Sequence, residues 1–342
     1  MNERKIVLIL AAVIAVIYIG IEPLAHAVMH PLPKVDYSYG DLADMPIEGN
    51  AKEGQKLVRA HCTMCHSVSV DLGSSPISKM ALKREFGDLY DENSQESYDK
   101  YCALSQARHF GVVPLDLSNV GRMYDPKFLA NFIKRPAHAS FESTYVIHKK
   151  TLFEEEVSEF EEESDEALQF SADYEKAMKD YLAETKISMP DFTKLSDDKI
   201  GDIVAYLDLI SRDLTPKEAT ELACGRCHSV DLAGIAMTTE KEALHEHFGT
   251  IPPDLSMIYK SRGEAHLHAF LNDPQAIILG SKMPRIGLNQ ASQQKIITYL
   301  ESVADPKKEE RESLAWWIIG YFLLFAVVTY LWYKNEYERI HE

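Results

Sequence analysis

Two short stretches of the chain, Cys62-Thr63-Met64-Cys65-His66 and Cys224-Gly225-Arg226-Cys227-His228, share the pattern Cys-x-x-Cys-His. This pattern is typical of covalent c-type haem attachment. Two thiols one helical turn apart can add to the two vinyl groups of one porphyrin, and the histidine that follows can ligate the iron. The sequence therefore predicts two covalently bound haem c groups.

Two further blocks follow each motif in the same order. A Pro-x-Asp-Leu-Ser block lies at 113–118 and again at 251–256, and a Met-Pro pair begins at Met189 and again at Met283. After each Met-Pro pair, apolar residues recur at helical spacing, which favours an amphipathic helix. Three matched blocks in one order indicate an internal duplication.

The expected fold is all-α: two tandem class I cytochrome c domains with a C-terminal transmembrane helix and an N-terminal hydrophobic segment. The expected parts are a signal peptide or N-terminal anchor at 1–30, a first cytochrome c domain with an acidic insert at 48–213, a second cytochrome c domain at 214–305 and a transmembrane anchor at 313–334. Helices are expected at 48–61, 127–135 and 264–273, and from Thr215, an N-cap followed by proline. Gly54 is small enough for the first of these helices to cross the last helix of its domain closely.

A haem iron bound by one histidine takes its sixth ligand from elsewhere in the chain, and that ligand decides the chemistry. A methionine thioether raises the reduction potential and suits electron transfer. Because the Met-Pro pairs are duplicated, they are the favoured source of this ligand. The predicted haem-binding residues are Cys62, Cys65, His66 and Met189 in the first half and Cys224, Cys227, His228 and Met283 in the second.

Other methionines and histidines lack a counterpart in the second copy, so we interpret them as core or ordinary polar residues. Asp116 and Asp254 are repeated and are expected to cap the short helix that follows each block. The residues set aside are Met80, Met123, Met178, Met257, His109, His138, His148, His266 and His268.

The N-terminal end has 16 uncharged residues, from Ile6 to Ile21, a length between a signal-peptide core and a full membrane span. Cleavage after Ala27 and retention as an anchor both fit the sequence. Glu22-Pro23 is expected to break the helix. Both alternatives place the following residues across the membrane, where haem c is assembled.

The C-terminal end has a run of 20 uncharged residues, Leu314 to Tyr333, which is long enough to span the hydrocarbon layer. Tryptophan and tyrosine lie near both ends of the run, as in an interfacial aromatic belt. The expected location is the cytoplasmic (inner) membrane, with the haem domains in the periplasm and both termini inside.

The net charge of −17 makes nucleic acid an unsuitable partner and favours a basic soluble protein. Residues 154–166 include nine acidic residues of 13, which form either a solvated surface segment or a docking surface for a basic cytochrome. Four of the five cysteines belong to the two motifs. The fifth, Cys102, is interpreted as a small buried hydrophobic residue.

With these features the chain resembles the dihaem cytochrome c1 subunit of bacterial cytochrome bc complexes (ubiquinol–cytochrome c reductases). The resemblance rests on the two tandem motifs, the Met-Pro pairs, the N-terminal segment that ends Glu22-Pro23-Leu24-Ala25-His26, and the C-terminal anchor with Trp316-Trp317. It implies cytochrome b and a Rieske iron–sulfur protein as partner subunits. Electrons would pass from the Rieske protein through both haems to a soluble cytochrome c or an oxidase.

By this resemblance the chain is an electron-transfer subunit rather than a catalyst on its own, and no catalytic residue is predicted. The second domain is expected to accept electrons first because it adjoins the anchor. The alternatives are the dihaem subunit of a cytochrome c oxidase and a dihaem cytochrome c peroxidase, which would need one haem without a methionine ligand.

Overall fold

The computed structural model describes residues 3–29, 35–72, 77–142, 189–278 and 281–341. Within these ranges the chain is helical, and its β-type pairings are two isolated bridges, Tyr124 with Leu288 and Val230 with Ile235. The expected all-α class is therefore confirmed for the described residues. The assignment of the halves to class I cytochrome c domains stays a prediction.

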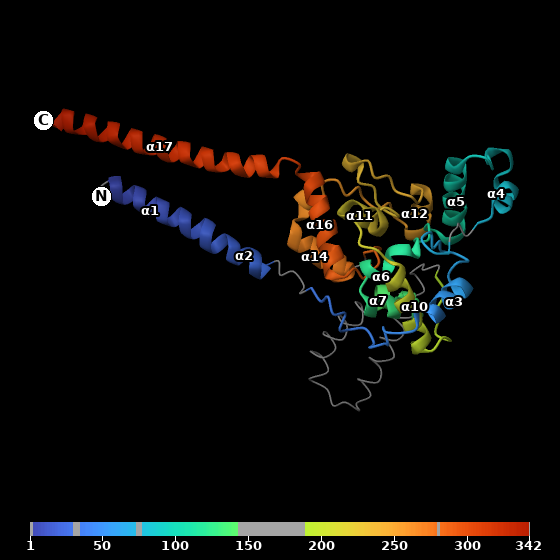
Figure 1. The fold of residues 1–342 in the computed structure, drawn as a ribbon. Helices are drawn as coiled ribbons and strands as arrows, with labels where there is room; N and C mark the ends of the chain where they lie inside the picture. The colour runs from blue at the N-terminus through green and yellow to red at the C-terminus, as the bar shows by residue number, and fades with distance from the viewer. Residues whose placement is uncertain (1–2, 30–34, 73–76, 143–188, 279–280, 342) are drawn as a thin grey trace, which may run out of the picture.

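The body consists of short helices that follow one another along the chain (Figure 1). They are α3 (Ala51–His61), α4 (Lys79–Phe86), η2 (Gly87–Leu89), α5 (Gln95–Phe110), η3 (Leu117–Asn119), α6 (Val120–Met123), α7 (Pro126–Lys134), η4 (His138–Glu142), α10 (Asp197–Ile210), α11 (Pro216–Cys224), η5 (Asp231–Ala233), α12 (Lys241–Phe248), α13 (Ile258–Arg262), α14 (Glu264–Asn272), α15 (Pro274–Ile277) and α16 (Gln290–Ala304).

Two helical segments extend away from the body. The first comprises α1 (Glu3–Ala15), η1 (Val16–Ile21) and α2 (Glu22–Met29), and the second is α17 (Lys308–His341). The helical stretches Lys5–Ala25 and Lys308–Ile340 each contain a run that is long and apolar enough to cross a membrane, and neither run is buried against the body.

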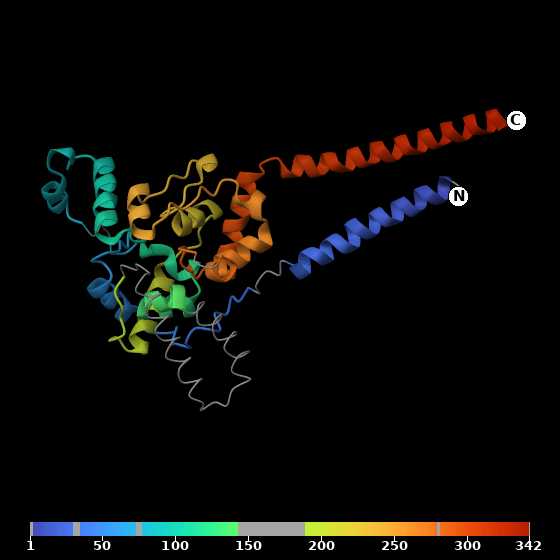
Figure 2. The same cartoon turned by 180° about the vertical axis from the view of Figure 1, so that it is seen from behind.

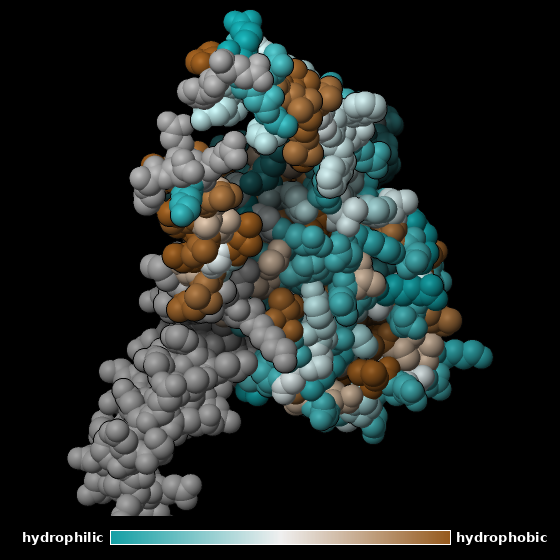
Figure 3. All heavy atoms as spheres, turned by 90° about the vertical axis from the view of Figure 1, so that its left-hand side faces the viewer, coloured by the Kyte–Doolittle hydropathy of each residue, from teal (hydrophilic) through white to brown (hydrophobic). Residues whose placement is uncertain are grey.

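Both segments leave the same side of the body in two opposite views (Figures 1 and 2). Figure 3 looks at that side, and hydrophobic side chains gather on the projecting helices while the face behind them is largely hydrophilic. If both segments cross a membrane, the two termini lie on one side of it and the body on the other.

The expected helix break at Glu22-Pro23 is wrong. The backbone of Glu22 is helical (φ −64°, ψ −50°), and α2 continues directly from the π-helix η1. Proline lacks an N–H and its ring clashes with a carbonyl one turn earlier in a regular α-helix. The wider π-helical turn directly before Pro23 relieves this conflict, so the helix passes through it.

In the first half, α3 crosses α10 at very close range. Gly54 is buried at the crossing, and a Cβ there would collide with the backbone of Asp202 and with the Tyr206 side chain. Gly121 meets Leu207 of α10 from another side in the same way. The prediction of a close crossing at Gly54 is confirmed, and α10 is the central helix of this half.

In the second half, α11 packs on α16. It begins with a capping box: Glu218 N donates to Thr215 Oγ1 at 3.3 Å, and Thr215 N donates to Glu218 Oε2 at 2.9 Å. The expected N-cap at Thr215 is confirmed. The small residues Ala219 and Ala223 are buried and allow α11 to approach its neighbours closely.

The two halves share one hydrophobic core. Val58, Ile203 and Leu207 of the first half belong to the same buried cluster as Ala219 and Ile296 of the second half. Transfer of apolar surface from water into this cluster stabilises both halves together. The expected domain boundary between residues 213 and 214 therefore does not divide the hydrophobic core, which is continuous across the two halves.

Backbone contacts join the halves at the edge of this core. Asp125 N donates to Gly287 O at 2.9 Å, and Tyr124 and Leu288 form one of the isolated bridges. Gly287 has a positive φ of 68°, and a Cβ at this position would collide with the Phe128 ring. Glycine is therefore required both by the backbone conformation and by the close contact.

Residues 36–50, which we call the strap, lie across both halves. On the second half, Tyr37 Oη donates to Gln293 Oε1 at 2.8 Å and Tyr39 Oη donates to Leu288 O at 2.7 Å. On the first half, Asn50 N donates to Asp202 Oδ1 at 2.6 Å. The strap thus connects the segment that follows α2 to both halves of the body.

Helices α4 and α5 form a hairpin inserted between the first motif and its Pro-x-Asp-Leu-Ser block. It lies at the far end of the body from α17 (Figure 1) and has a small core of its own. Cys102 is buried in that core, which confirms its interpretation as a buried hydrophobic residue. The acidic stretch 154–166, Met178 and His148 lie outside the described residues.

We expect Gly54→Val to destabilise the protein by about 1–3 kcal/mol, because the new side chain would collide with the α10 backbone. Thermal unfolding of the full chain in detergent measures the loss. Ala60→Val, at an exposed position of the same helix, adds the same β-branched side chain without a collision. Equal losses in the two variants would show that the crossing is not tight.

Candidate functional site

The first motif continues directly from helix α3. Cys62 is the C-cap of α3, and Cys65 N and His66 N both donate to Cys62 O, at 3.1 and 2.9 Å. This turn places the two thiols and the imidazole on one short piece of chain. His66 Nδ1 lies 2.7 Å from Leu115 O. Because a carbonyl oxygen can only accept, Nδ1 carries the proton and Nε2 keeps its lone pair.

The second motif repeats this geometry. Cys227 N and His228 N donate to Cys224 O at 3.0 and 2.8 Å, and His228 Nδ1 donates to Pro253 O at 2.7 Å. Pro253 occupies the same position in its Pro-x-Asp-Leu-Ser block as Leu115 in the first. Both imidazoles are therefore oriented by a backbone carbonyl and present Nε2 as a potential ligand.

Asp116, in the first Pro-x-Asp-Leu-Ser block, holds that block against the first motif; we call this arrangement the clamp. Asp116 is the N-cap of η3 and accepts from Ser118 N at 2.8 Å, which confirms the expected capping role. It also accepts from Ser67 Oγ, the residue after the histidine, at 2.7 Å. Leu117 N donates to Ser67 O at 2.9 Å. The block is thereby fixed against the chain that carries His66.

The second half contains the same clamp. Asp254 accepts from Ser256 N at 3.0 Å and from Ser229 Oγ at 3.2 Å, and Leu255 N donates to Ser229 O at 2.9 Å. This clamp was not among the features predicted from the sequence. Its signal is present in the sequence, since a Ser-Val pair follows the histidine in both motifs.

Two hydrogen bonds made by Thr239 connect the second motif to the first-half Pro-x-Asp-Leu-Ser block. Thr239 N donates to Arg226 O, between the cysteines of the second motif, at 3.2 Å. Thr239 Oγ1 accepts from Val113 N at 3.1 Å. Val113 opens the block whose Leu115 carbonyl orients His66. The turn of the second motif thus rests against the part of the chain that orients the first histidine.

Burial keeps both imidazoles neutral. It lowers the pKa of His66 and that of His228, and this effect outweighs the hydrogen bonds to Leu115 O and Pro253 O, which act in the opposite direction. A neutral imidazole with Nδ1 protonated is the form that ligates a metal through Nε2.

Burial also raises the pKa of the motif thiols. The pKa of Cys62 is raised to about 11, with a smaller contribution from Cys65, and that of Cys224 to about 12, with a smaller contribution from Cys227. The four groups are protonated at neutral pH, and all are free thiols in the structure. Each therefore carries the hydrogen that addition to a vinyl group requires.

Met189 and Met283 are both partly buried, each at the start of a Met-Pro pair that precedes the last helix of its half. Met283 packs against the cluster of Leu267, Leu271 and Ile297. Two bonds hold its backbone: Gln275 Nε2 donates to Met283 O at 2.7 Å, and Met283 N donates to Ser281 Oγ at 3.3 Å. That these methionines face His66 and His228 stays a prediction.

Among the rival methionines, Met80 is 75% exposed, Met257 is half exposed and Met123 is buried in the shared core. His268 uses both ring nitrogens, Nδ1 with Tyr37 and Gln293 and Nε2 with Gln294. These environments agree with their interpretation as surface, core or structural residues.

A buried ion pair fixes the loop that carries Met283. Arg285 donates to the Asp41 carboxylate of the strap at 2.7 and 3.1 Å, with only 3% and 7% of the two side chains exposed. Arg285 Nε donates to Asn272 O at 3.0 Å, and its guanidinium lies 4.7 Å from the centre of the Tyr39 ring. The strap thus determines where the Met283 loop lies.

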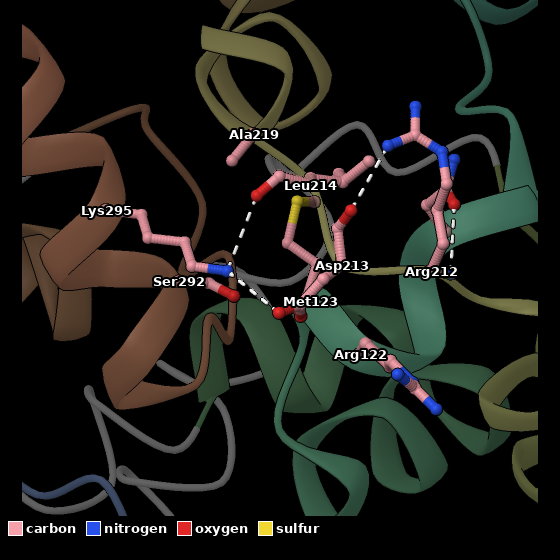
Figure 4. A pocket seen from close by; sticks show the side chains of 9 residues that line it. Arg122, Met123, Arg212, Asp213, Leu214, Ala219, Ser292 and Lys295 are labelled. Atoms are coloured by element: carbon pink, nitrogen blue, oxygen red, sulfur yellow. Dashed lines mark hydrogen bonds and ion pairs between the residues drawn. The ribbon is translucent and has the colours of Figure 1, made fainter. Parts of the chain in front are cut away.

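Two cavities lie near these elements. A cavity of about 10 Å³ lies between the halves, where Lys295, Asp213 and Met123 point toward one another (Figure 4). It has room for about one water molecule and is too small for a substrate. A second cavity of about 500 Å³ lies between α5 and the chain after the first motif, lined in part by Ser67, Gln106 and Thr238. Neither lining includes a predicted haem-binding residue.

Among the described residues no group of three or more His, Cys, Asp or Glu side chains could hold a metal ion directly. A haem needs fewer protein ligands, because its porphyrin supplies four. The residues fit such a group in two respects: each motif presents an imidazole Nε2 beside two protonated thiols, and the Nε of Arg226 is buried without a partner. Protein-family models, curated proteins and solved structures gave no match to this chain.

We expect Asp41→Ala to lower the free energy of unfolding by about 3–5 kcal/mol, because it leaves the buried Arg285 charge unpaired. Asp44→Ala, three residues away, removes an ion pair between Lys127 and a fully exposed carboxylate, and should leave the free energy of unfolding nearly unchanged. Denaturant unfolding of the full chain compares the two. A small loss for both variants would show that the strap does not fix the Met283 loop.

The clamp at Asp116 should make the free energy of unfolding depend on pH in the acidic range. Burial by itself would raise the pKa of Asp116, but hydrogen bonds from Ser118 and Ser67 outweigh it and hold the pKa below the usual 3.8. The carboxylate therefore stabilises the fold above about pH 4, and this contribution is lost as the pH falls through the folded-state pKa. Asp116→Asn should flatten the dependence of unfolding free energy on pH below 4; an unchanged slope would contradict the clamp.

Proposed function

We propose that this chain is a membrane-anchored dihaem c-type cytochrome that carries electrons from a Rieske iron–sulfur protein, after quinol oxidation, to a soluble cytochrome c or a terminal oxidase. The observation that carries the proposal is the duplicated histidine geometry. In both halves a Cys-x-x-Cys-His turn holds an imidazole whose Nδ1 donates to a carbonyl of the Pro-x-Asp-Leu-Ser block. A repeated, oriented imidazole beside two protonated thiols is what covalent haem attachment requires.

In each half the two thiols would form the covalent attachment. The S–H of each cysteine would add across a vinyl group, with sulfur bonding to one carbon and hydrogen to the other, so that no oxidant would be needed. Cys62 and Cys65 would act in the first half and Cys224 and Cys227 in the second, and each histidine would bind the iron through Nε2. A bound haem supplies a one-electron redox centre.

The methionines would complete each site. A thioether ligand from Met189 or Met283 favours ferrous iron and closes the iron to small molecules, which suits electron transfer more than peroxide chemistry. The buried Arg285–Asp41 pair, two residues after Met283, supports this role because it fixes the loop that would supply the ligand. We assign no catalytic residue and treat the chain as an electron-transfer subunit of a quinol–cytochrome c oxidoreductase.

The two apolar helical segments favour a place in a membrane complex. They bear on membrane association alone; the proposed location in the inner membrane, with the body in the periplasm, follows from where haem c is attached. Cytochrome b and a Rieske protein are the proposed partner subunits, and the net charge of −17 suits a basic soluble acceptor. The short C-terminal part beyond the apolar run would lie on the opposite side of the membrane from the haems.

Purification from membranes tests the proposal. We expect two covalent haems per chain by haem stain and pyridine haemochrome, co-purifying cytochrome b and Rieske subunits, and quinol–cytochrome c activity. The double variant Cys224→Ser, Cys227→Ser should retain one covalent haem, and Cys102→Ser should retain two because that thiol lies in a separate core.

Other outcomes would replace the proposal. Recovery with oxidase subunits would make the chain the dihaem subunit of a cytochrome c oxidase. One high-spin haem at rest, together with peroxide turnover, would make it a dihaem peroxidase. Absence of covalent haem from the purified chain would remove all three functions.

A further inference from the structure

His268 lies where the strap meets the second half, and its ring has hydrogen-bond partners on both sides. Nδ1 lies 2.7 Å from Tyr37 Oη of the strap and 2.9 Å from Gln293 Oε1 of α16. Nε2 lies 3.1 Å from Gln294 Oε1, also of α16. The side chain is only 16% exposed, so these contacts take the place of water.

The partners of Nδ1 require a proton on that nitrogen. Tyr37 Oη donates its only hydrogen to Gln293 Oε1 at 2.8 Å, and burial raises the pKa of Tyr37, so this hydroxyl stays neutral. An amide oxygen can only accept, and the hydroxyl has no second hydrogen to give. Nδ1 must therefore donate to both oxygens.

The partner of Nε2 requires a second proton. Gln294 Nε2 donates to Glu264 Oε1 at 3.1 Å, because a carboxylate can only accept. This bond holds the amide of Gln294 with its oxygen toward His268, so Nε2 must donate to that oxygen. The hydrogen bonds around His268 are therefore those of an imidazolium, which carries a hydrogen on each nitrogen.

The charged groups around the ring favour this positive charge. Glu264, one turn earlier on α14, has a carboxylate oxygen 3.9 Å from Nε2. The strap contributes the neutral Tyr37 and, next to it, Asp36, whose carboxylate accepts hydrogen bonds within the strap itself. Helix α16 presents the uncharged amides already described. The nearest charge to a protonated His268 is thus the negative one of Glu264, which stabilises it.

The part of the strap beside this histidine also fixes the Met283 loop. Asp36 pairs with Asn272 of α14 through two bonds: its N donates to Asn272 Oδ1 at 3.2 Å, and its O accepts from Asn272 Nδ2 at 3.0 Å. The carbonyl of Asn272 accepts from Arg285, which is also paired with Asp41 of the strap. Helix α14 therefore connects the histidine contact to the loop through consecutive hydrogen bonds.

We propose that His268 is a pH-sensitive latch: protonated, it fastens the strap to α14 and α16 and holds the Met283 loop in place, and neutral, it loosens both. Histidine is the side chain whose charge ordinarily changes between about pH 5 and 8. A neutral ring has one hydrogen, so it loses the bond to Gln294, and its bond to the strap is no longer charge-assisted. Charge-assisted hydrogen bonds are about twice as strong as neutral ones. The latch therefore stabilises the strap in acid, and this contribution is lost as the pH rises through the range in which imidazole titrates.

The latch belongs to the fold of the second half and requires no haem. Under the proposed function it gains a use, because oxidation of a quinol releases protons together with electrons. Acid produced by that reaction would fasten the loop that supplies the proposed methionine ligand of the second iron.

Denaturant unfolding of the full chain in detergent, at about pH 5.5 and about pH 8, tests the latch. In acid we expect His268→Gln to raise the unfolding equilibrium constant about tenfold, since glutamine cannot supply a charge-assisted bond. At about pH 8 the same change should raise the constant about twofold at most.

His266→Gln is the matched control. The ring of His266 stacks on Phe270 of the same helix, and burial and the charge of Arg262 lower its pKa. A histidine of this kind costs stability when it becomes charged, so the effect of His266→Gln should be no larger in acid than at about pH 8.

A second measurement follows the strap and the loop directly. Hydrogen exchange at about pH 5.5 should show less protection of residues 36–41 and 283–287 in His268→Gln than in the unaltered chain, with residues 95–110 of the α4–α5 hairpin unchanged. Glu264→Gln removes the facing carboxylate from a half-exposed position and should give the same pattern at smaller size. This milder variant is the test if His268→Gln does not fold.

Equal losses for His268→Gln at the two pH values, or a larger loss at about pH 8, would overturn the latch, because they would show a purely structural histidine. Reduced protection in the strap alone would overturn its connection to the Met283 loop. Either result, in a chain with two covalent haems and quinol–cytochrome c activity, would leave the proposed function standing. The expected pH-dependent loss in a chain without covalent haem would support the latch and overturn the function.

Discussion

The hydrogen bond from each motif histidine to a backbone carbonyl is the interaction on which the rest of this structure depends. Its donor is an Nδ1 on a turn that continues a helix, and its acceptor lies in a separate block, 49 residues later in the first half and 25 later in the second. The aspartate-serine clamp fixes that block against the turn. This one hydrogen bond determines both the tautomer and the orientation of the ring. Each half therefore folds into a structure that holds an imidazole with a free Nε2.

The shared core makes the two histidine sites parts of one body. Residues of both halves belong to the same hydrophobic cluster. The strap reaches from Asn50, which donates to Asp202 of α10, to Tyr37 and Asp41, which bond to residues of the second half. A displacement of one half against the other would expose apolar surface and separate the buried Arg285–Asp41 pair, and both changes are unfavourable. Two redox centres held in such a body would keep a constant separation, a condition for a reproducible electron-transfer rate.

The sequence predicted those features that depend on local pattern. The all-α class and the N-cap at Thr215 are confirmed because capping and helix periodicity act over a few residues. The close crossing at Gly54 and the buried state of Cys102 are also confirmed, because the size and polarity of a single side chain indicate how closely it can be packed. It did not predict that helix α2 continues through Pro23, since a preceding π-helical turn has no simple signature. The strap and the Asp116–Ser67 clamp were missed for another reason. They join residues far apart in the chain, and pairing of that kind follows from the tertiary fold.

The two halves repeat the same histidine geometry, but their mutual contact is asymmetric. The turn of the second motif, at Arg226, is joined through Thr239 to the block that orients His66, whereas Met64 at the matching position of the first motif is exposed. Such a heterologous contact gives the pair an order that a symmetric contact would lack. The second motif begins where α11 packs on α16, and α16 leads directly into α17. The order along the molecule is therefore apolar helix, second motif, first motif. Under the proposed function, this order would correspond to electron entry at the second site and exit from the first.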